Sequence, residues 1–226
     1  MATQPIYQFY SELEDYEPKI LRRLQVPRNI TMAKLGYILM TMYEMQASHL
    51  FCLEVPVGEG VLLRYEPPAE DSLPTEDGIR VNDASKSMLG RQFHRAGTKL
   101  KMQYDYGDGW EIALTLEEVF TDKDLPGREL PRVLDGSGYG IIEDCGGPDG
   151  LERLAEAFRQ KKGRTYQEYR EWLGHDSVDL SAFDKDNMNL RLKKVPRIYM
   201  ELYEYEFAPT QRSIDVLDRR YLKKKD

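Results

Sequence analysis

Cysteine and histidine are both scarce in this sequence, which has two of the first and three of the second among 226 residues. Two cysteines, Cys52 and Cys145, do not suggest a disulfide framework. His94 and His175 have no nearby partner at metal-ligand spacing. His49 and Cys52 lie three positions apart in a predicted strand, so they should point to opposite faces and cannot chelate one ion without a bulge.

Long apolar runs and known catalytic motifs are also missing. The most apolar run, 35–45, is too short and interrupted to span a bilayer. The first five residues lack the basic and apolar regions of a signal peptide, so we expect a cytoplasmic protein without a membrane partner. No P-loop, G-x-S-x-G, H-E-x-x-H or flanked G-x-G-x-x-G occurs, which argues against the common hydrolases and nucleotide-binding enzymes.

Charge and composition describe an ordinary globular protein. The hydrophobic fraction is 41%, the charged fraction is 31% and the net charge is −7. This acidic balance argues against broad nucleic-acid binding, which needs a basic face, although a local basic patch remains open.

The best-defined stretch is 99–116, which predicts a β-hairpin. Apolar residues alternate with polar ones on both sides of Gly107-Asp108-Gly109, as in half-buried strands. A three-residue loop places Tyr106 opposite Trp110 on the apolar face, and Gly109 supplies the left-handed residue. We expect both aromatic residues in the core and Asp108 bracing its own turn.

This register also places two acids side by side. Asp105 would lie opposite Glu111, and a like-charged pair is destabilising unless a cation is near. With Asp108, and with Glu143 and Asp144 if their loop packs beside the hairpin, these carboxylates could hold a divalent ion such as Mg²⁺ or Ca²⁺. The alternative, which we favour, is that Arg22 or Arg23 neutralises them in a salt-bridge network. No other cofactor is evident.

The order of elements predicts an α+β fold. Strands 6–13 and 19–26, a helix capped by Thr31 and strands 50–55 and 61–65 suggest a β-grasp-like N-terminal unit in a mixed, largely antiparallel sheet. Arg22 falls on the apolar side of its strand. The central hairpin at 99–119 follows, and the C-terminal part is helical. Between these elements we expect a loop at 66–80 and a short helix through Met88 and Phe93, capped by Asn82, Asp83 or Ser85. An irregular stretch at 121–140 follows the hairpin. Helices are expected at 151–158, 166–173 and 184–194, and either a helix or a strand at 198–207.

A glycine-rich turn precedes the helix that starts near residue 151. Free backbone N–H groups in Gly146-Gly147-Pro148 could bind an anion at the positive end of the helix dipole. A simpler interpretation, which we favour, is chain entry with Asp149 as the cap.

Four motifs in order make the chain resemble a known family. They are the double arginine at 20–24, the Tyr-Asp-Tyr-Gly-Asp-Gly-Trp hairpin at 104–110, the Glu-Asp-Cys-Gly-Gly-Pro loop at 143–148 and Trp-Leu-Gly at 172–174. The chain resembles the plasmid pRiA4b ORF-three-like family, whose members are also labelled insertion-element passenger or TnpR-like proteins. The motif residues at the two turns are Tyr104, Tyr106, Gly107, Gly109, Trp110, Gly146, Gly147 and Pro148.

The resemblance implies a mobile-DNA setting and covers about residues 5–194. It implies no activity, because the family has no established one. Where many members carry a His-x-His pair, this chain has His49-Leu50-Phe51, so the resemblance does not by itself imply a histidine-based role here. We therefore expect one family-like domain at 1–194 and an extension at 195–226. The end of the extension is locally basic. It could form a solvated tail, which we favour, fold back on the acidic hairpin or touch a phosphate backbone.

Three functions stay open. The first, which we favour, is a non-enzymatic binding module for a protein or nucleic acid. The second is a metal-dependent enzyme acting on nucleic acid or phosphate esters through the acidic cluster. The third is a structural or assembly protein. The sequence does not indicate an oligomeric state.

Overall fold

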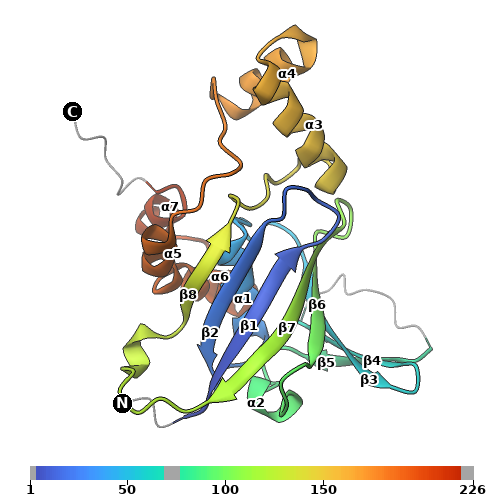
Figure 1. The fold of residues 1–226 in the computed structure, drawn as a ribbon, viewed down its shortest axis with the longest axis vertical. Coiled ribbons are helices and arrows are strands. Elements are labelled where there is room, and N and C mark those ends of the chain that lie inside the picture. Colours follow the sequence, from blue (N-terminus) through green and yellow to red (C-terminus); the bar gives the residue numbers. More distant parts are fainter. Residues whose placement is uncertain (1–3, 69–76, 220–226) are drawn as a thin grey trace.

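The computed structural model of the chain describes residues 4–68 and 77–219, and its centre is one mixed sheet (Figure 1). The strand order is β5-β4-β3-β6-β7-β1-β2-β8, and only the β4–β5 pair is parallel. The predicted α+β class is confirmed, whereas the β-grasp-like character of the first unit stays a prediction. The strands are β1 (Ile6–Leu13), β2 (Leu21–Pro27), β3 (Phe51–Gly58), β4 (Val61–Glu66), β5 (Ile79–Asp83), β6 (Lys99–Tyr104), β7 (Trp110–Phe120) and β8 (Arg132–Ser137).

Helices cover one face of this sheet and extend from one end of it (Figure 1). In the part of the chain that the structure describes, no helix is long and apolar enough to cross a membrane. The helices are α1 (Met32–Met42), α2 (Leu89–Gln92), α3 (Gly147–Gln160), α4 (Gly163–Leu173), α5 (Lys185–Leu192), α6 (Val195–Tyr205) and α7 (Gln211–Leu217), with a 3₁₀ turn at Gly127–Glu129.

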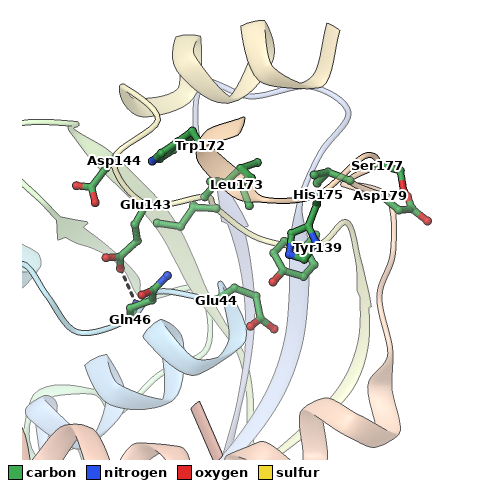
Figure 2. A pocket seen from close by; sticks show the side chains of 13 residues that line it. Glu44, Gln46, Tyr139, Glu143, Asp144, Trp172, Leu173, His175, Ser177 and Asp179 are labelled. Carbon is green, nitrogen blue, oxygen red and sulfur yellow. Dashed lines mark hydrogen bonds between the residues drawn. The ribbon is translucent and has the colours of Figure 1, made fainter. Parts of the chain in front are cut away.

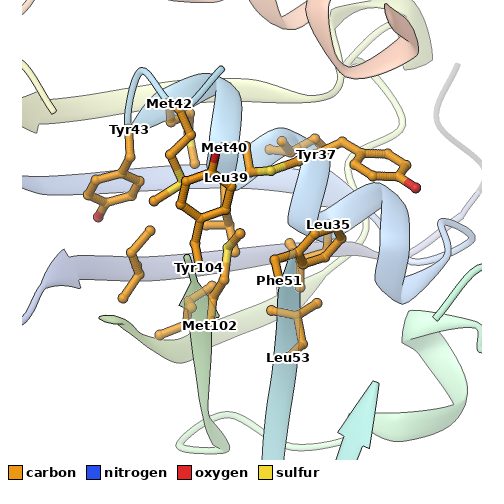
Figure 3. Packing of buried hydrophobic residues seen from close by; sticks show 14 of the residues in the cluster. Leu35, Tyr37, Leu39, Met40, Met42, Tyr43, Phe51, Leu53, Met102 and Tyr104 are labelled. Atoms are coloured by element: carbon orange, nitrogen blue, oxygen red, sulfur yellow. The ribbon is translucent and has the colours of Figure 1, made fainter. Parts of the chain in front are cut away.

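The core lies between α1 and the inner face of the sheet (Figure 3). Thr31 caps α1 by accepting a hydrogen bond from the backbone N–H of Lys34, as predicted. Ten of the eleven residues of α1 are buried, because the sheet covers one side and α6 packs on another. The methionines of this helix, Met32, Met40 and Met42, are therefore core residues. The stretch 198–207, whose form was left open, is helical as far as Tyr205, where α6 ends, and Tyr199 on α6 is buried against this core. The predicted boundary at residue 194 stays a prediction.

Two strands lie where loops were predicted. Both β5 and β8 are edge strands, so each pairs on one side only and shows little apolar alternation. The predicted cap of the short helix was also wrong: α2 begins after Met88 without a side-chain cap, and Asp83 instead accepts hydrogen bonds from the backbone N–H and hydroxyl of Ser85.

The central hairpin forms, but in a register two residues away from the prediction. Tyr104 pairs with Trp110 and Met102 pairs with Ile112, which leaves a five-residue loop from Asp105 to Gly109. A shift of two keeps the apolar face inward, and Trp110 is buried as expected. Tyr106 moves into the loop and is only partly buried. The predicted left-handed conformation of Gly109 is present, with φ of +68°.

Candidate metal centre

Three loops meet at the end of the hairpin and bring one imidazole to three carboxylates. The Nε2 atom of His49 lies 3.5 Å from Asp105 Oδ2, 3.3 Å from Asp144 Oδ1 and 3.9 Å from Glu143 Oε2. His49 precedes β3, Asp105 follows β6, and the two adjacent acids precede α3. The sequence predicted that the acids could meet but did not place His49 with them.

His49 is held from two directions. Its ring packs edge-on against Tyr104, with centroids 5.8 Å apart. The next residue, Leu50, accepts a backbone hydrogen bond from the N–H of Asp105, which ties the two loops together. The Nε2 atom is buried and makes no hydrogen bond among the described residues. A neutral imidazole nitrogen in this position could serve as a ligand for a cation.

Asp105, rather than Asp108, braces the hairpin turn. Its Oδ1 accepts hydrogen bonds from the backbone N–H groups of Gly107 and Asp108, at 3.1 and 3.3 Å. This leaves Oδ2 directed toward His49. The residue has φ of +53°, a left-handed conformation that aspartate tolerates better than most residues.

Glu143 is the anchored member of the cluster. Its buried carboxylate accepts hydrogen bonds from the backbone N–H of Gln46 at 2.5 Å and from the hydroxyl groups of Ser48 and Tyr104. Burial, followed by the charge of Glu143, raises the pKa of Tyr104, so this hydroxyl stays protonated and donates to the carboxylate. Asp144 differs, because its side chain is 70% exposed.

The start of α3 binds a carboxylate of the protein itself. Asp108 Oδ2 accepts a hydrogen bond from the backbone N–H of Gly146, at 3.2 Å. Gly146 is the N-cap and has no side-chain cap, so the prediction of Asp149 as cap was wrong. Gly147, with φ of +69°, lies so close to the hairpin that a Cβ atom would collide with the carbonyl oxygen of Asp108. This contact fixes the loop of Glu143 and Asp144 against the hairpin.

Glu111 belongs to a separate network. It faces Gln103 rather than Asp105. Lys101 Nζ lies 2.6 Å from Glu111 and 2.9 Å from Glu14. A positive charge beside Glu111 was predicted and is present, but a lysine of the same hairpin supplies it.

The prediction that Arg22 or Arg23 neutralises Asp105 and Glu111 was wrong. Arg23 pairs with Glu117, at 2.8 Å. Arg22 is fully buried, and all its donors reach backbone carbonyl groups, because it lies inside the sheet at the junction of β2, β8 and the end of α1. The acceptors are the oxygens of Leu21, Met42, Ser137, Gly138 and Tyr139.

A pocket of about 610 Å³ adjoins the cluster and shares Glu143 and Asp144 with it. Figure 2 shows Trp172 and Leu173 on one side of the pocket, Gln46 and Glu44 on the opposite side, and Tyr139 with His175 at one end. The end of α4 and the segment after it therefore form a wall, which places the Trp-Leu-Gly motif beside the acidic loop. The other lining residues are Ile141, Ile142, Ser177, Val178 and Asp179.

The geometry of the cluster fits a metal ion. Two donor atoms that are each about 2.1 Å from a tetrahedral ion lie about 3.4 Å from one another. The distances from His49 to Asp105 and Asp144 are close to this value, and donor atoms of the three residues lie within 4.8 Å of one another. Sequence patterning did not predict His49 as a ligand, because the residue was expected in a strand, whereas β3 begins at Phe51.

Comparisons with known proteins identify relatives but no activity. The family model described as "Plasmid pRiA4b ORF-3-like protein" matches residues 5–191. An uncharacterized protein, y4hQ of Sinorhizobium fredii, is 31% identical over 180 residues, which cover 78% of this chain and 85% of that protein. The crystal structure of MM3350, a protein of unknown function from Methanosarcina mazei Go1, has a TM-score of 0.67 at 23% identity and covers 81% of this chain and 97% of that one. This last likeness concerns the fold alone.

Proposed function

Because the chain belongs to the plasmid pRiA4b ORF-3-like family, whose relatives named above are uncharacterised, we propose its function from the geometry: a metal-dependent enzyme centred on His49, Asp105 and Asp144. The observation that carries the proposal is the buried Nε2 atom of His49, which faces carboxylate oxygens at 3.3 and 3.5 Å without a hydrogen bond among the described residues.

The ligand types select the metal. Mg²⁺ and Ca²⁺ prefer sites made entirely of oxygen, whereas an imidazole with carboxylates suits Zn²⁺, Mn²⁺ or Fe²⁺. The histidine therefore narrows the choice left by the sequence, which pointed to hard cations. Three protein ligands leave at least one coordination position for water or substrate, which is typical of catalytic rather than structural sites.

The exposure of the ligands supports catalysis. Asp144 is 70% exposed and lines the pocket, so an ion at this site would have an open side. A metal ion in such a position lowers the pKa of bound water and polarises a substrate oxygen. Glu143 would hold the site in place from beneath, because its own oxygens already accept three hydrogen bonds.

Metal titration of two matched variants tests this proposal. Asp105→Asn and Glu111→Gln each remove one charge from the same hairpin, and asparagine keeps the oxygen that braces the turn. Calorimetry on chelator-treated protein should show one Mn²⁺ or Zn²⁺ per chain, with affinity at least about tenfold weaker in Asp105→Asn and unchanged in Glu111→Gln. No uptake of either ion at millimolar concentration would refute the proposal.

A second candidate, a nucleic-acid-binding module in a mobile-element setting, is favoured by one surface feature. Tyr205 and Phe207 are 54% and 62% exposed, and their rings stack with centroids 5.7 Å apart. Exposed stacked rings are suited to bases of single strands. The basic residues Arg220, Lys223, Lys224 and Lys225, which follow in the sequence, lie outside the described residues.

Anisotropy of a labelled single-stranded oligonucleotide tests this second candidate. Replacing Tyr205 and Phe207 by serine should weaken binding about tenfold, and replacing residues 223–225 by alanine should reduce its salt dependence. If the unchanged protein and the two variants bind with equal affinity and equal salt dependence, nucleic-acid binding at this surface is refuted.

A further inference from the structure

The pocket beside the proposed metal site has an aromatic wall. Trp172 is 48% exposed and lines the pocket next to Leu173. The other tryptophan, Trp110, is buried in the core. A partly exposed indole in a cavity offers a flat surface of about the size of a base or other planar ring. The volume of about 610 Å³ is also in the range typical of small-molecule sites.

The charges around the pocket limit the ligand. Glu44 is neutralised by Arg191 and Arg219, at 3.6 and 2.5 Å. At the opposite end, Asp105, Glu143 and Asp144 carry three negative charges against two on a divalent ion, which leaves a net charge of about −1 by simple addition. This net charge repels a doubly charged anion about twice as strongly as a singly charged one, so a singly charged group is the better match for the metal. An ammonium group would be attracted but has no lone pair for the metal.

Hydrogen-bonding groups occupy the end of the pocket away from Glu143 and Asp144, where Asp179 also lies. Figure 2 shows Tyr139 and His175 together there. Burial raises the pKa of Tyr139, so its hydroxyl remains protonated. Such groups can bind the polar edge of a ring that lies along Trp172.

We infer that this pocket binds a small molecule in which a planar ring carries a singly charged oxygen group, with the ring against Trp172 and the oxygen on the metal ion. The inference rests on the proposed metal site, because the acidic end would repel an anion without the ion. Phosphodiesters and carboxylates share this chemistry.

Calorimetry on Mn²⁺-loaded protein distinguishes a phosphodiester ligand from a carboxylate ligand. The probes are thymidine 5′-(p-nitrophenyl phosphate), a ring-bearing phosphodiester, and 1-naphthoate, a ring-bearing carboxylate. Thymidine and dimethyl phosphate supply the ring and the anion alone. We expect one or both ring-bearing anions to bind at least about tenfold more tightly than either part, and only with Mn²⁺. Binding of the diester alone identifies a phosphodiester site, and binding of naphthoate alone identifies a carboxylate site.

Variants of exposed side chains provide the second readout. Trp172→Ala should weaken probe binding about tenfold and leave Mn²⁺ affinity unchanged, whereas Trp172→Phe should keep most of the affinity. Leu190→Ala, which removes an exposed apolar side chain outside the pocket lining, should change neither. Mn²⁺ uptake without binding of either probe, or with equal binding in Trp172→Ala, overturns the inference while the metal site stands. Absence of Mn²⁺ uptake overturns both.

Discussion

Two carboxylate clusters flank the same hairpin and differ in how their charge is balanced. In the first, Glu14 and Glu111 share Lys101, within 2.9 Å of each acid. In the second, the basic side chain that faces Asp105 and Asp144 among the described residues is His49, which carries a charge only when protonated. A cluster that includes its own lysine needs no ligand to balance it. The second cluster has a reason to bind a cation, and this contrast separates a structural network from a candidate site.

Backbone conformation separates the clusters further. Asp105 and Asp144 both have positive φ angles, of +53° and +59°. Each such residue costs about 1 kcal/mol or more, and such conformations collect at functional sites. Lys101 and Glu111 lie in regular strands β6 and β7 without this strain. Among the acids of the two clusters, Asp105 and Asp144 are the two with a left-handed backbone.

The largest effect should come from the contact that joins the second cluster together. Gly147 and Gly109 have nearly equal φ angles, +69° and +68°, but only Gly147 lies against another backbone, at Asp108. Gly147→Ala should lower the free energy of unfolding by about 3 kcal/mol through strain and overpacking, and Gly109→Ala by about 1 kcal/mol through strain alone. Urea denaturation measures both. Equal losses would mean that the close approach contributes nothing to stability.

A smaller effect is expected at the anchor of the second cluster. Glu143→Gln keeps the shape of the side chain but removes the charge that Tyr104, Ser48 and the backbone of Gln46 stabilise. Mn²⁺ affinity should fall about 10- to 100-fold, as for other groups that hold metal ligands in place, and stability should fall by about 1–3 kcal/mol. Calorimetry and urea denaturation test the two parts. Glu14→Gln, in the first cluster, is the control and should leave Mn²⁺ affinity unchanged.

The sequence predicted which face of each strand is buried better than it predicted which residues and strands pair with one another. Alternation identified the inner face of the hairpin, but a shift of two residues preserves alternation, so the pattern could not exclude the five-residue loop. The left-handed conformation of Asp105 that permits this loop has no reliable sequence signal, unlike that of Gly109. Arg22 was recognised as being on the apolar side, yet its acceptors belong mainly to segments around β8, a strand that was not predicted.

The site was predictable in part for the same reason. Local spacing brings Asp105 and Asp108 into one turn, and the adjacent pair Glu143 and Asp144 into another. The contact between those turns depends on tertiary structure, as does the position of His49 two residues before β3 begins. Spacing within one strand excluded His49 as a partner of Cys52 but carried no information about acids more than fifty residues away.

The smallest expected effect concerns the first cluster and tests whether it is only structural. Glu111, then Glu14, raises the pKa of Lys101. A raised pKa in the folded state means that the stabilisation is fully present below the pKa of the unfolded chain, about 10.4, and is lost as the pH rises through the folded value. Lys101 is 38% exposed, so solvent screening limits the contribution to less than about 1 kcal/mol.

Lys101→Met should therefore lower stability by less than about 1 kcal/mol at pH 7 and pH 9, and the difference from the unchanged protein should shrink above about pH 10.4. Urea denaturation at pH 7, at pH 9 and above about pH 10.4 measures this difference in stability. Mn²⁺ affinity should stay constant at pH 7, because Lys101 pairs with Glu14 and Glu111 and with none of the proposed ligands. A fall in Mn²⁺ affinity of tenfold or more would show that the two clusters act as one, because the lysine would then be needed to hold the hairpin end in the shape that the metal requires.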